Sequence, residues 1–173
     1  GRKREQNEDN HRVWNPESAE ERERRGVLLV IADGMGGAVA GEVASRLAVE
    51  TVTQYYGIAD GDPPGDLRRA VEAANQTVHE KTRTDPSLQG MGTTCTALAL
   101  HGGYAWIAHV GDSRAYLLRG GELHQLTRDH TLVAQLVEKQ QLRPDQARTD
   151  SRRNVVTRSI GVGPRVEVDT FAI

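Results

Sequence analysis

An aspartate stands among glycines directly after an apolar run. Asp33 follows residues 27–32 (VLLVIA), and Gly34, Gly36 and Gly37 complete the stretch ADGMGG. Glycine permits backbone angles and close approaches that other residues resist. A carboxylate beside a bare carbonyl on a rigid turn suits a hard divalent cation such as Mg²⁺ or Mn²⁺. A glycine turn with a helix-capping aspartate explains the same spacing equally well.

A second group of charged side chains lies near the start, in RKREQNEDN at residues 2–10. Arg4 stands five residues before Asp9, and Glu8 is the neighbour of Asp9. A carboxylate for a metal and a guanidinium for a phosphate oxygen are the two requirements of phosphate-ester hydrolysis. Charged runs near a terminus are usually solvated, so this pattern indicates little by itself.

A third acidic group occurs in VGDSR at residues 110–114, where Asp112 is either a ligand or the first residue of a turn. In TRDH, Asp129 is predicted to cap a helix. The six histidines do not cluster along the chain, and Cys95 falls inside a predicted strand as a small buried residue. The chemistry that these residues indicate is therefore that of carboxylates and a metal.

The elements that must position these residues follow from periodicity and turn signals. The charged segment 17–25 lacks apolar periodicity and is predicted to be a solvated loop or a frayed turn. Asp66 is predicted to cap a helix, and Gly-Gly pairs predict hairpin turns. The predicted strands are 27–32, 93–100, 104–110, 113–119, 122–127 and 166–173. The predicted helices are 41–56, one that begins at residue 66, one that follows residue 129 and a short one that begins at residue 144. This order predicts an α+β fold with antiparallel sheet.

Composition excludes several classes of function. The 173 residues suit one domain, and 22 Lys and Arg against 24 Asp and Glu give a net charge of −2, which argues against a nucleic-acid-binding surface. A single cysteine excludes an internal disulfide and any Cys-rich zinc site. No apolar run reaches the roughly 18–20 residues of a membrane span, and no signal peptide opens the chain. We therefore expect a cytoplasmic protein without a membrane segment.

Seven ordered segments resemble the type-2C, metal-dependent protein Ser/Thr phosphatases (the PPM family), in particular their bacterial branch. They extend from the start of the chain to residue 161. They are GRKREQNED (1–9), ADGMGG (32–37), GEVASRLAVE (41–50), GMGTT (90–94), AHVGDSRAYLLRGGEL (108–123), QLTRDHT (125–131) and RRNVVTRSIG (152–161).

The resemblance implies an αββα sandwich of two antiparallel sheets flanked by helices, and a set of site residues. Asp33 would bridge two Mn²⁺ or Mg²⁺ ions, and the Gly34 carbonyl would be a ligand of one of them. Asp9 matches the N-terminal acidic position, and Arg4 matches the phosphate-binding arginine. Asp112 matches a residue associated with a third metal ion. Residues 140–154 correspond to a variable flap beside the site.

The implied activity is hydrolysis of phosphoserine and phosphothreonine in proteins by a metal-bridging hydroxide, with Arg4 and Asp33 as catalytic residues. The implied partners are phosphoproteins, including bacterial Ser/Thr kinases and their targets. A histidine that relatives place near the glycines is replaced here by Met35 or Ala38, so the general acid is unassigned.

Two further family aspartates have no match in this sequence. We therefore expect residues 1–173 to be a single phosphatase domain that lacks its C-terminal strands and helix, with weak or no turnover when isolated. The alternative is a non-catalytic pseudophosphatase module that binds a phosphoprotein or a regulatory partner.

Overall fold

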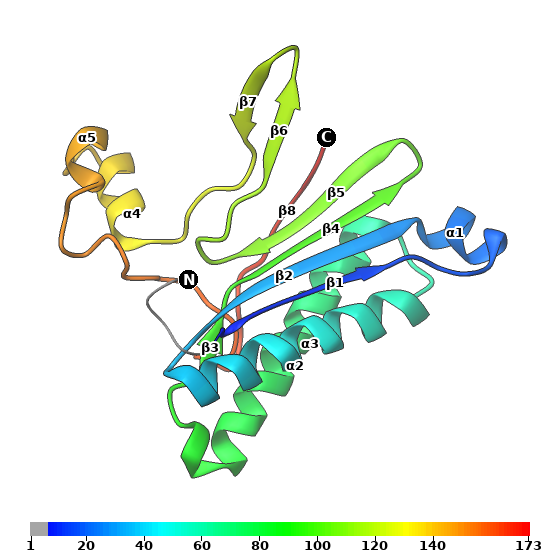
Figure 1. Ribbon diagram of the computed structural model, residues 1–173, viewed down its shortest axis with the longest axis horizontal. Helices are drawn as coiled ribbons and strands as arrows, with labels where there is room; N and C mark the ends of the chain where they lie inside the picture. The colour runs from blue at the N-terminus through cyan, green and yellow to red at the C-terminus, as the bar shows by residue number, and fades with distance from the viewer. Residues whose placement is uncertain (1–6) are drawn as a thin grey trace.

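A computed structural model describes residues 7–173. Its main feature is a six-stranded antiparallel sheet in the order β1-β2-β4-β5-β8, with β3 paired to β2 (Figure 1). The strands of this sheet are β1 (Asp9–Trp14), β2 (Val27–Met35), β3 (Gly92–Thr93), β4 (Cys95–His101), β5 (Tyr104–Val110) and β8 (Asp169–Ala172). The α+β class and the antiparallel pairing are as predicted, although the last strand is shorter than the predicted 166–173.

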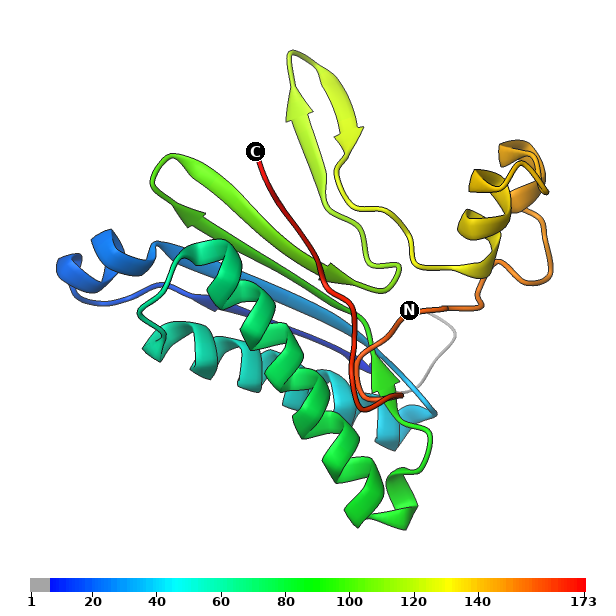
Figure 2. The ribbon, with the colours of Figure 1, turned by 180° about the vertical axis from the view of Figure 1, so that it is seen from behind.

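Two long helices cover one face of this sheet, α2 (Ala38–Ile58) and α3 (Pro63–Thr84) (Figure 2). Their inner faces carry small side chains, so the helices pack close to each other and to β2 and β4. The core formed in this way is aliphatic, as expected for a chain with few aromatic residues. Its fully buried members include Leu28, Ala44, Ala48, Val52, Ala70, Val71, Ala74, Ala97 and Ala99.

The segment 17–25, predicted to be a loop or frayed turn, is a helix, α1 (Ala19–Arg25). Ser18 caps its N-terminus by accepting a hydrogen bond from the Glu21 N–H. Arg25 at its last turn is buried and forms an ion pair with Asp66, 2.7 Å between Nη1 and Oδ2. The prediction was wrong because a single buried arginine, rather than an apolar stripe, attaches this helix to the core.

Two predicted helix caps were also wrong. Helix α3 begins after Asp62, whose side chain accepts from the Gly65 N–H, because Asp66 is buried against Arg25. Helix α4 (Leu132–Glu138) is capped by Thr131, while Asp129 forms an ion pair with Arg114 instead. In both places a short polar residue nearby was free to cap, and the aspartate found a cationic partner.

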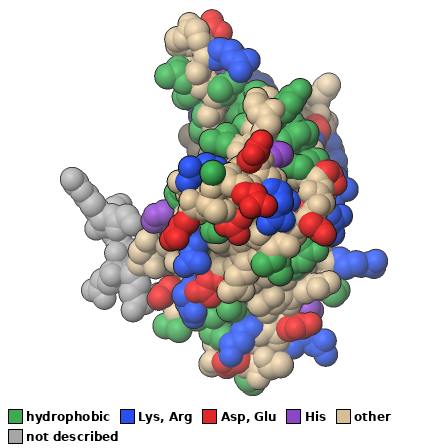
Figure 3. All heavy atoms as spheres, turned by 90° about the vertical axis from the view of Figure 1, so that its right-hand side faces the viewer, with side chains coloured by type: hydrophobic (Ala, Val, Ile, Leu, Met, Phe, Trp, Pro, Cys, Tyr) green, Lys and Arg blue, Asp and Glu red, His purple; other side chains and the backbone are tan. Residues whose placement is uncertain are grey.

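The remaining elements lie outside the six-stranded sheet. A hairpin of β6 (Tyr116–Arg119) and β7 (Glu122–Gln125) forms a separate two-stranded sheet, and α4 is followed by the short α5 (Pro144–Ala147) (Figure 1). A 3-10 turn, η1 (Pro86–Leu88), follows α3. On the face drawn in Figure 3, basic and acidic side chains are interspersed. None of the helices in the described part of the chain combines the length and apolar character that crossing a bilayer requires.

Candidate active site

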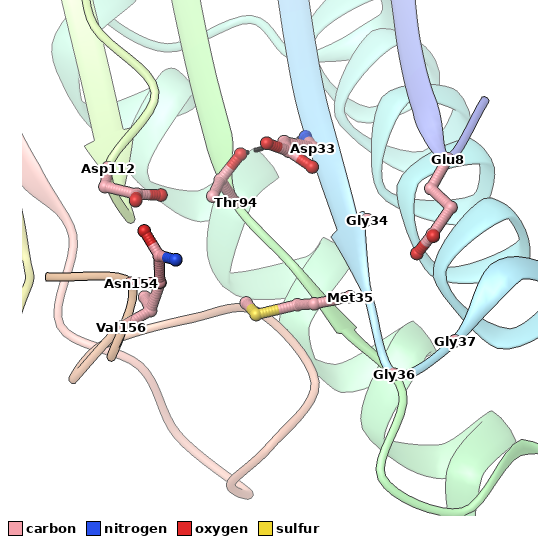
Figure 4. Close-up of a pocket in the computed structure, with 10 residues that line it drawn as sticks. All are labelled: Glu8, Asp33, Gly34, Met35, Gly36, Gly37, Thr94, Asp112, Asn154 and Val156. Atoms are coloured by element: carbon pink, nitrogen blue, oxygen red, sulfur yellow. Dashed lines mark hydrogen bonds between the residues drawn. The ribbon is translucent and has the colours of Figure 1, made fainter. Parts of the chain in front are cut away.

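A cavity of about 470 Å³ lies where the end of β2 meets the loop after β5 (Figure 4). Carboxylates from three separate segments line it, those of Glu8, Asp33 and Asp112. The glycine stretch after Asp33 and a polar side chain, Asn154, complete much of the wall. The fold thus gathers acidic residues that stand up to 104 positions apart in the sequence.

The backbone at Asp33 is held from both sides by two threonines of the Gly92-Thr93-Thr94 segment. The Asp33 N–H donates to Thr94 Oγ1 at 2.9 Å (Figure 4). The Asp33 carbonyl accepts from the Thr94 N–H at 2.9 Å and from Thr93 Oγ1 at 3.0 Å. Thr94 Oγ1 also contacts Ser113 Oγ at 2.7 Å, so it connects the Asp33 strand with the Asp112 loop.

Gly34 permits a close approach of two backbones. A Cβ atom there would lie 2.0 Å from the carbonyl oxygen of Gly41, in the first turns of α2. The Gly34 N–H donates to the carbonyl of Glu8 at 3.2 Å. The alternative prediction that Asp33 caps this helix is wrong, because α2 has Gly37 at its N-cap position and no side-chain cap.

Strand alternation separates the two neighbouring acids of the N-terminal segment. Asp9 pairs with Asp33 in the β1–β2 register, and the two residues line a second, smaller hollow. Glu8 lines the main cavity instead, and its backbone carbonyl accepts from Ser45 Oγ at 2.5 Å. The sequence alone indicates Glu8 only as the neighbour of Asp9, and Arg4, predicted to bind phosphate, lies outside the described residues.

The Asp112 loop is fixed through the residue before it. Gly111 has a φ of 110°, and a Cβ there would lie 2.6 Å from the Thr94 side chain. His130 holds Gly111 twice, because its backbone N–H donates to the Gly111 carbonyl at 2.8 Å and its Nδ1 accepts from the Gly111 N–H at 3.0 Å. That acceptor role assigns the proton of neutral His130 to Nε2, which lies 3.0 Å from Asp169 Oδ2.

Burial and charge act on the ionisable groups behind this loop. Desolvation lowers the pKa of His130 and of the adjacent His109, even though Asp169 partly opposes the shift. Partial burial of Asp169 opposes its ionisation, but hydrogen bonds from His130 and Arg158 outweigh burial and lower the pKa of Asp169. The two histidines are therefore neutral at physiological pH, and His130 is an acceptor that positions the loop.

The thiol of Cys95 is unsuited to act as a nucleophile. Cys95 is completely buried in β4, and desolvation raises its pKa to about 12. A thiol with that pKa holds almost no thiolate at neutral pH. The sequence gives no role to Thr94, Ser113, His130 or Asn154. The first three lie in the GMGTT, GDSR and TRDH segments, which did mark the region.

The cavity offers the kind of oxygen ligands that Mg²⁺ and Mn²⁺ prefer. Among residues 7–173, however, no three His, Cys, Asp or Glu side chains come close enough together to form a metal cage. Mg²⁺ commonly binds through one or two carboxylates and keeps several water ligands. The donor set therefore fits a partly hydrated cation at Asp33, with Glu8 and Asp112 as further acidic groups on the wall.

Comparison with known sequences places this chain among phosphatases. The profile of the family described as "Protein phosphatase 2C" matches residues 2–160. Serine/threonine protein phosphatase PstP of Mycobacterium tuberculosis is 42% identical over 144 residues, which cover 81% of this chain and 27% of PstP. Serine/threonine phosphatase stp of Listeria monocytogenes is 35% identical over 178 residues, which cover 100% of this chain and 68% of the relative.

Solved structures give the same result. Stp1 from Staphylococcus aureus superposes with a TM-score of 0.88 at 32% identity, covering 99% of this chain and 67% of the Stp1 chain. The catalytic domain of PstP in complex with two manganese ions superposes with a TM-score of 0.79 at 37% identity, covering 98% of this chain and 66% of that chain. The profile match and these relatives together show that the chain belongs to the protein phosphatase 2C family.

Proposed function

We propose that residues 1–173 belong to one phosphatase domain that hydrolyses phosphoserine and phosphothreonine in proteins with the help of Mn²⁺ or Mg²⁺. The observation that supports this best is the meeting of Glu8, Asp33 and Asp112 in one cavity. A manganese complex of a relative that is 37% identical agrees with the choice of metal. The match to this chain spans only 27% of the length of PstP, so the activity that a longer protein containing this domain would have is itself proposed here.

In this proposal Asp33, which lines both hollows, would be the principal carboxylate for the cations, with the Gly34 carbonyl and Asp112 as further ligands in the main cavity and Asp9 as a ligand from the smaller hollow. Arg4 binds a phosphate oxygen of the substrate. Divalent cations would neutralise the negative charge of the phosphoryl oxygens and lower the pKa of a bound water. Two threonines that clamp the Asp33 backbone keep its carboxylate fixed as charge redistributes during phosphoryl transfer.

The substrates in this proposal are phosphoproteins, including Ser/Thr kinases and their targets. Phosphoryl transfer to water needs positioning and charge neutralisation rather than a covalent intermediate. The buried, protonated Cys95 agrees with a mechanism that uses no protein nucleophile.

The test is phosphate release from a phosphothreonine peptide during long incubation with the purified chain, in Mn²⁺ and in EDTA. We expect slow, Mn²⁺-dependent release that Asp33→Asn abolishes. The matched control is Asp60→Asn, at an exposed aspartate in the connection between α2 and α3. Release that Asp33→Asn leaves unchanged would contradict the proposal, and binding of the peptide without any release would favour the non-catalytic module.

A further inference from the structure

A second and larger hollow, of about 790 Å³, continues from the active-site cavity. Asp112 and Asn154 line both spaces, so the two adjoin. The floor of the larger hollow is partly apolar and comes from α4 and α5, through Val133, Ala134 and Ala147. We call it the flap groove, because residues 140–154 form one of its sides.

Four of the seven charged residues in the flap groove are paired with each other, and a fifth, Asp112, lies where the groove adjoins the active-site cavity. Arg114 binds Asp129 with two hydrogen bonds, at 2.8 Å from Nε and 2.6 Å from Nη2. Arg128 forms an ion pair with Glu138. Because the charges within each pair cancel, these four residues add no net charge to the groove.

Two arginines of the same groove have no acidic partner among residues 7–173. The side chain of Arg148 makes no hydrogen bond or ion pair with these residues, and the side chain of Arg153 donates only to the backbone carbonyl of Asp150 at 3.4 Å. Their neighbours outside the groove differ. Arg143 is paired with Asp145, and Arg152 with Asp150. The uncompensated positive charge of this segment therefore faces the groove.

From this charge distribution we infer that the flap groove binds an acidic segment of the substrate protein, with Arg148 and Arg153 donating hydrogen bonds to its carboxylates while the phosphorylated residue occupies the Asp33 cavity. The inference rests on the proposed function for the position of the phosphorylated residue. Arginine suits this task because its planar guanidinium binds carboxylates in a fixed geometry. The apolar floor would contact the aliphatic parts of the bound segment.

The expected effect is modest, because both arginines are exposed. Two exposed Arg–carboxylate pairs together contribute about 1 kcal/mol, which corresponds to an approximately fivefold preference in Kd. Screening by salt should reduce that preference, since the groups are solvent-accessible. The affinity for the phosphoryl group itself should depend much less on these arginines.

The experiment uses four fluorescent peptides in a two-by-two design, with threonine or phosphothreonine at the centre and Glu or Gln at the flanking positions on both sides. Kd is measured by fluorescence anisotropy in Mn²⁺ buffer. The variants are Arg148→Gln, Arg153→Gln and their combination, and the control is Arg143→Gln, whose side chain lies outside the groove. Circular dichroism establishes that each variant is folded.

We expect the Glu peptides to bind about fivefold more tightly than the Gln peptides, and the double variant to remove this preference while Arg143→Gln keeps it. Equal Kd values for Glu and Gln peptides with the wild-type chain would overturn the inference, whatever the variants do. So would a preference that the double variant retains. The effect of the central phosphate is a separate comparison, and its absence would count against the proposed function.

Discussion

Removing the charge of Asp66 should destabilise the fold strongly. Arg25 and Asp66 are buried, with side chains 1% and 2% exposed, and lie 2.7 Å apart. Arg25 also donates twice to the Tyr56 carbonyl, at 2.8 and 3.1 Å, and its guanidinium lies 4.1 Å from the centre of the Tyr56 ring. These contacts join α1 to both long helices beneath the sheet.

The variant Asp66→Asn keeps the size of the side chain and leaves the Arg25 charge buried without a counter-ion. Breaking a buried ion pair in this way costs about 3–5 kcal/mol. We expect the lower end, about 3 kcal/mol, because the carbonyls of Tyr56 and Gly61 still accept from Arg25. That loss corresponds to a decrease in Tm of about 6–12 °C for a chain of this size.

The assay is urea unfolding followed by circular dichroism at pH 7. Arg69→Gln is the control, because Arg69 binds the other oxygen of Asp66 but is half-exposed, and we expect a much smaller loss than for Asp66→Asn. Replacement of both buried partners, Arg25→Met with Asp66→Leu, should recover much of the stability. A loss below about 1 kcal/mol for Asp66→Asn would refute the reasoning.

Two further predictions concern the site. Gly34→Ala should prevent native packing of β2 against α2, because the new Cβ would lie 2.0 Å from the Gly41 carbonyl oxygen, a backbone atom that cannot rotate away. We expect the cooperative urea transition to be lost or its midpoint to decrease strongly, and an unchanged midpoint would contradict this prediction. Acidification should lower the free energy of unfolding between about pH 7 and 5. Burial lowers the pKa values of His109 and His130 below the ordinary value near 6.5, so these histidines take up protons in the unfolded state before they do so in the folded state. A urea midpoint that rises on acidification in this window would contradict the prediction.

Local signals made much of the fold predictable. The apolar run before Asp33 and the Gly-Gly pairs at 102–103 and 120–121 correctly predicted a strand and two hairpins, because these signals depend only on neighbouring residues. The apolar run also indicates a strand buried on both faces, and this was wrong, because β2 is buried on one face only and Ile31 is exposed on the other. Helix α1 was missed because its one buried side chain, Arg25, is stabilised by a residue 41 positions away. No local pattern carries that information.

The site was predictable in kind but not in arrangement. The glycines around Asp33 indicated the close approach of a ligand, and the structure gives Gly34 a second role that the sequence did not indicate, the close packing of its backbone against Gly41. Glu8 and Asp9 line different hollows, because Asp9 is the first residue of β1 and Glu8 precedes the strand, and the sequence did not show where this strand begins. His130 supports the Asp112 loop through Gly111, 19 positions away in the sequence, and this contact requires the tertiary fold.

The central claim is that Asp33 and the cavity around it bind a divalent cation. Mn²⁺ broadens the NMR signals of nearby amide protons, so a titration of the ¹⁵N-labelled chain reveals where the ion binds even when binding is weak. We predict that the amide signals of residues 33–37, Thr94 and Asp112 broaden first, and that Asp33→Asn removes this selectivity while Asp60→Asn preserves it. Broadening centred on the acidic residues of α1 or of the α2–α3 connection, and unaffected by Asp33→Asn, would contradict the account.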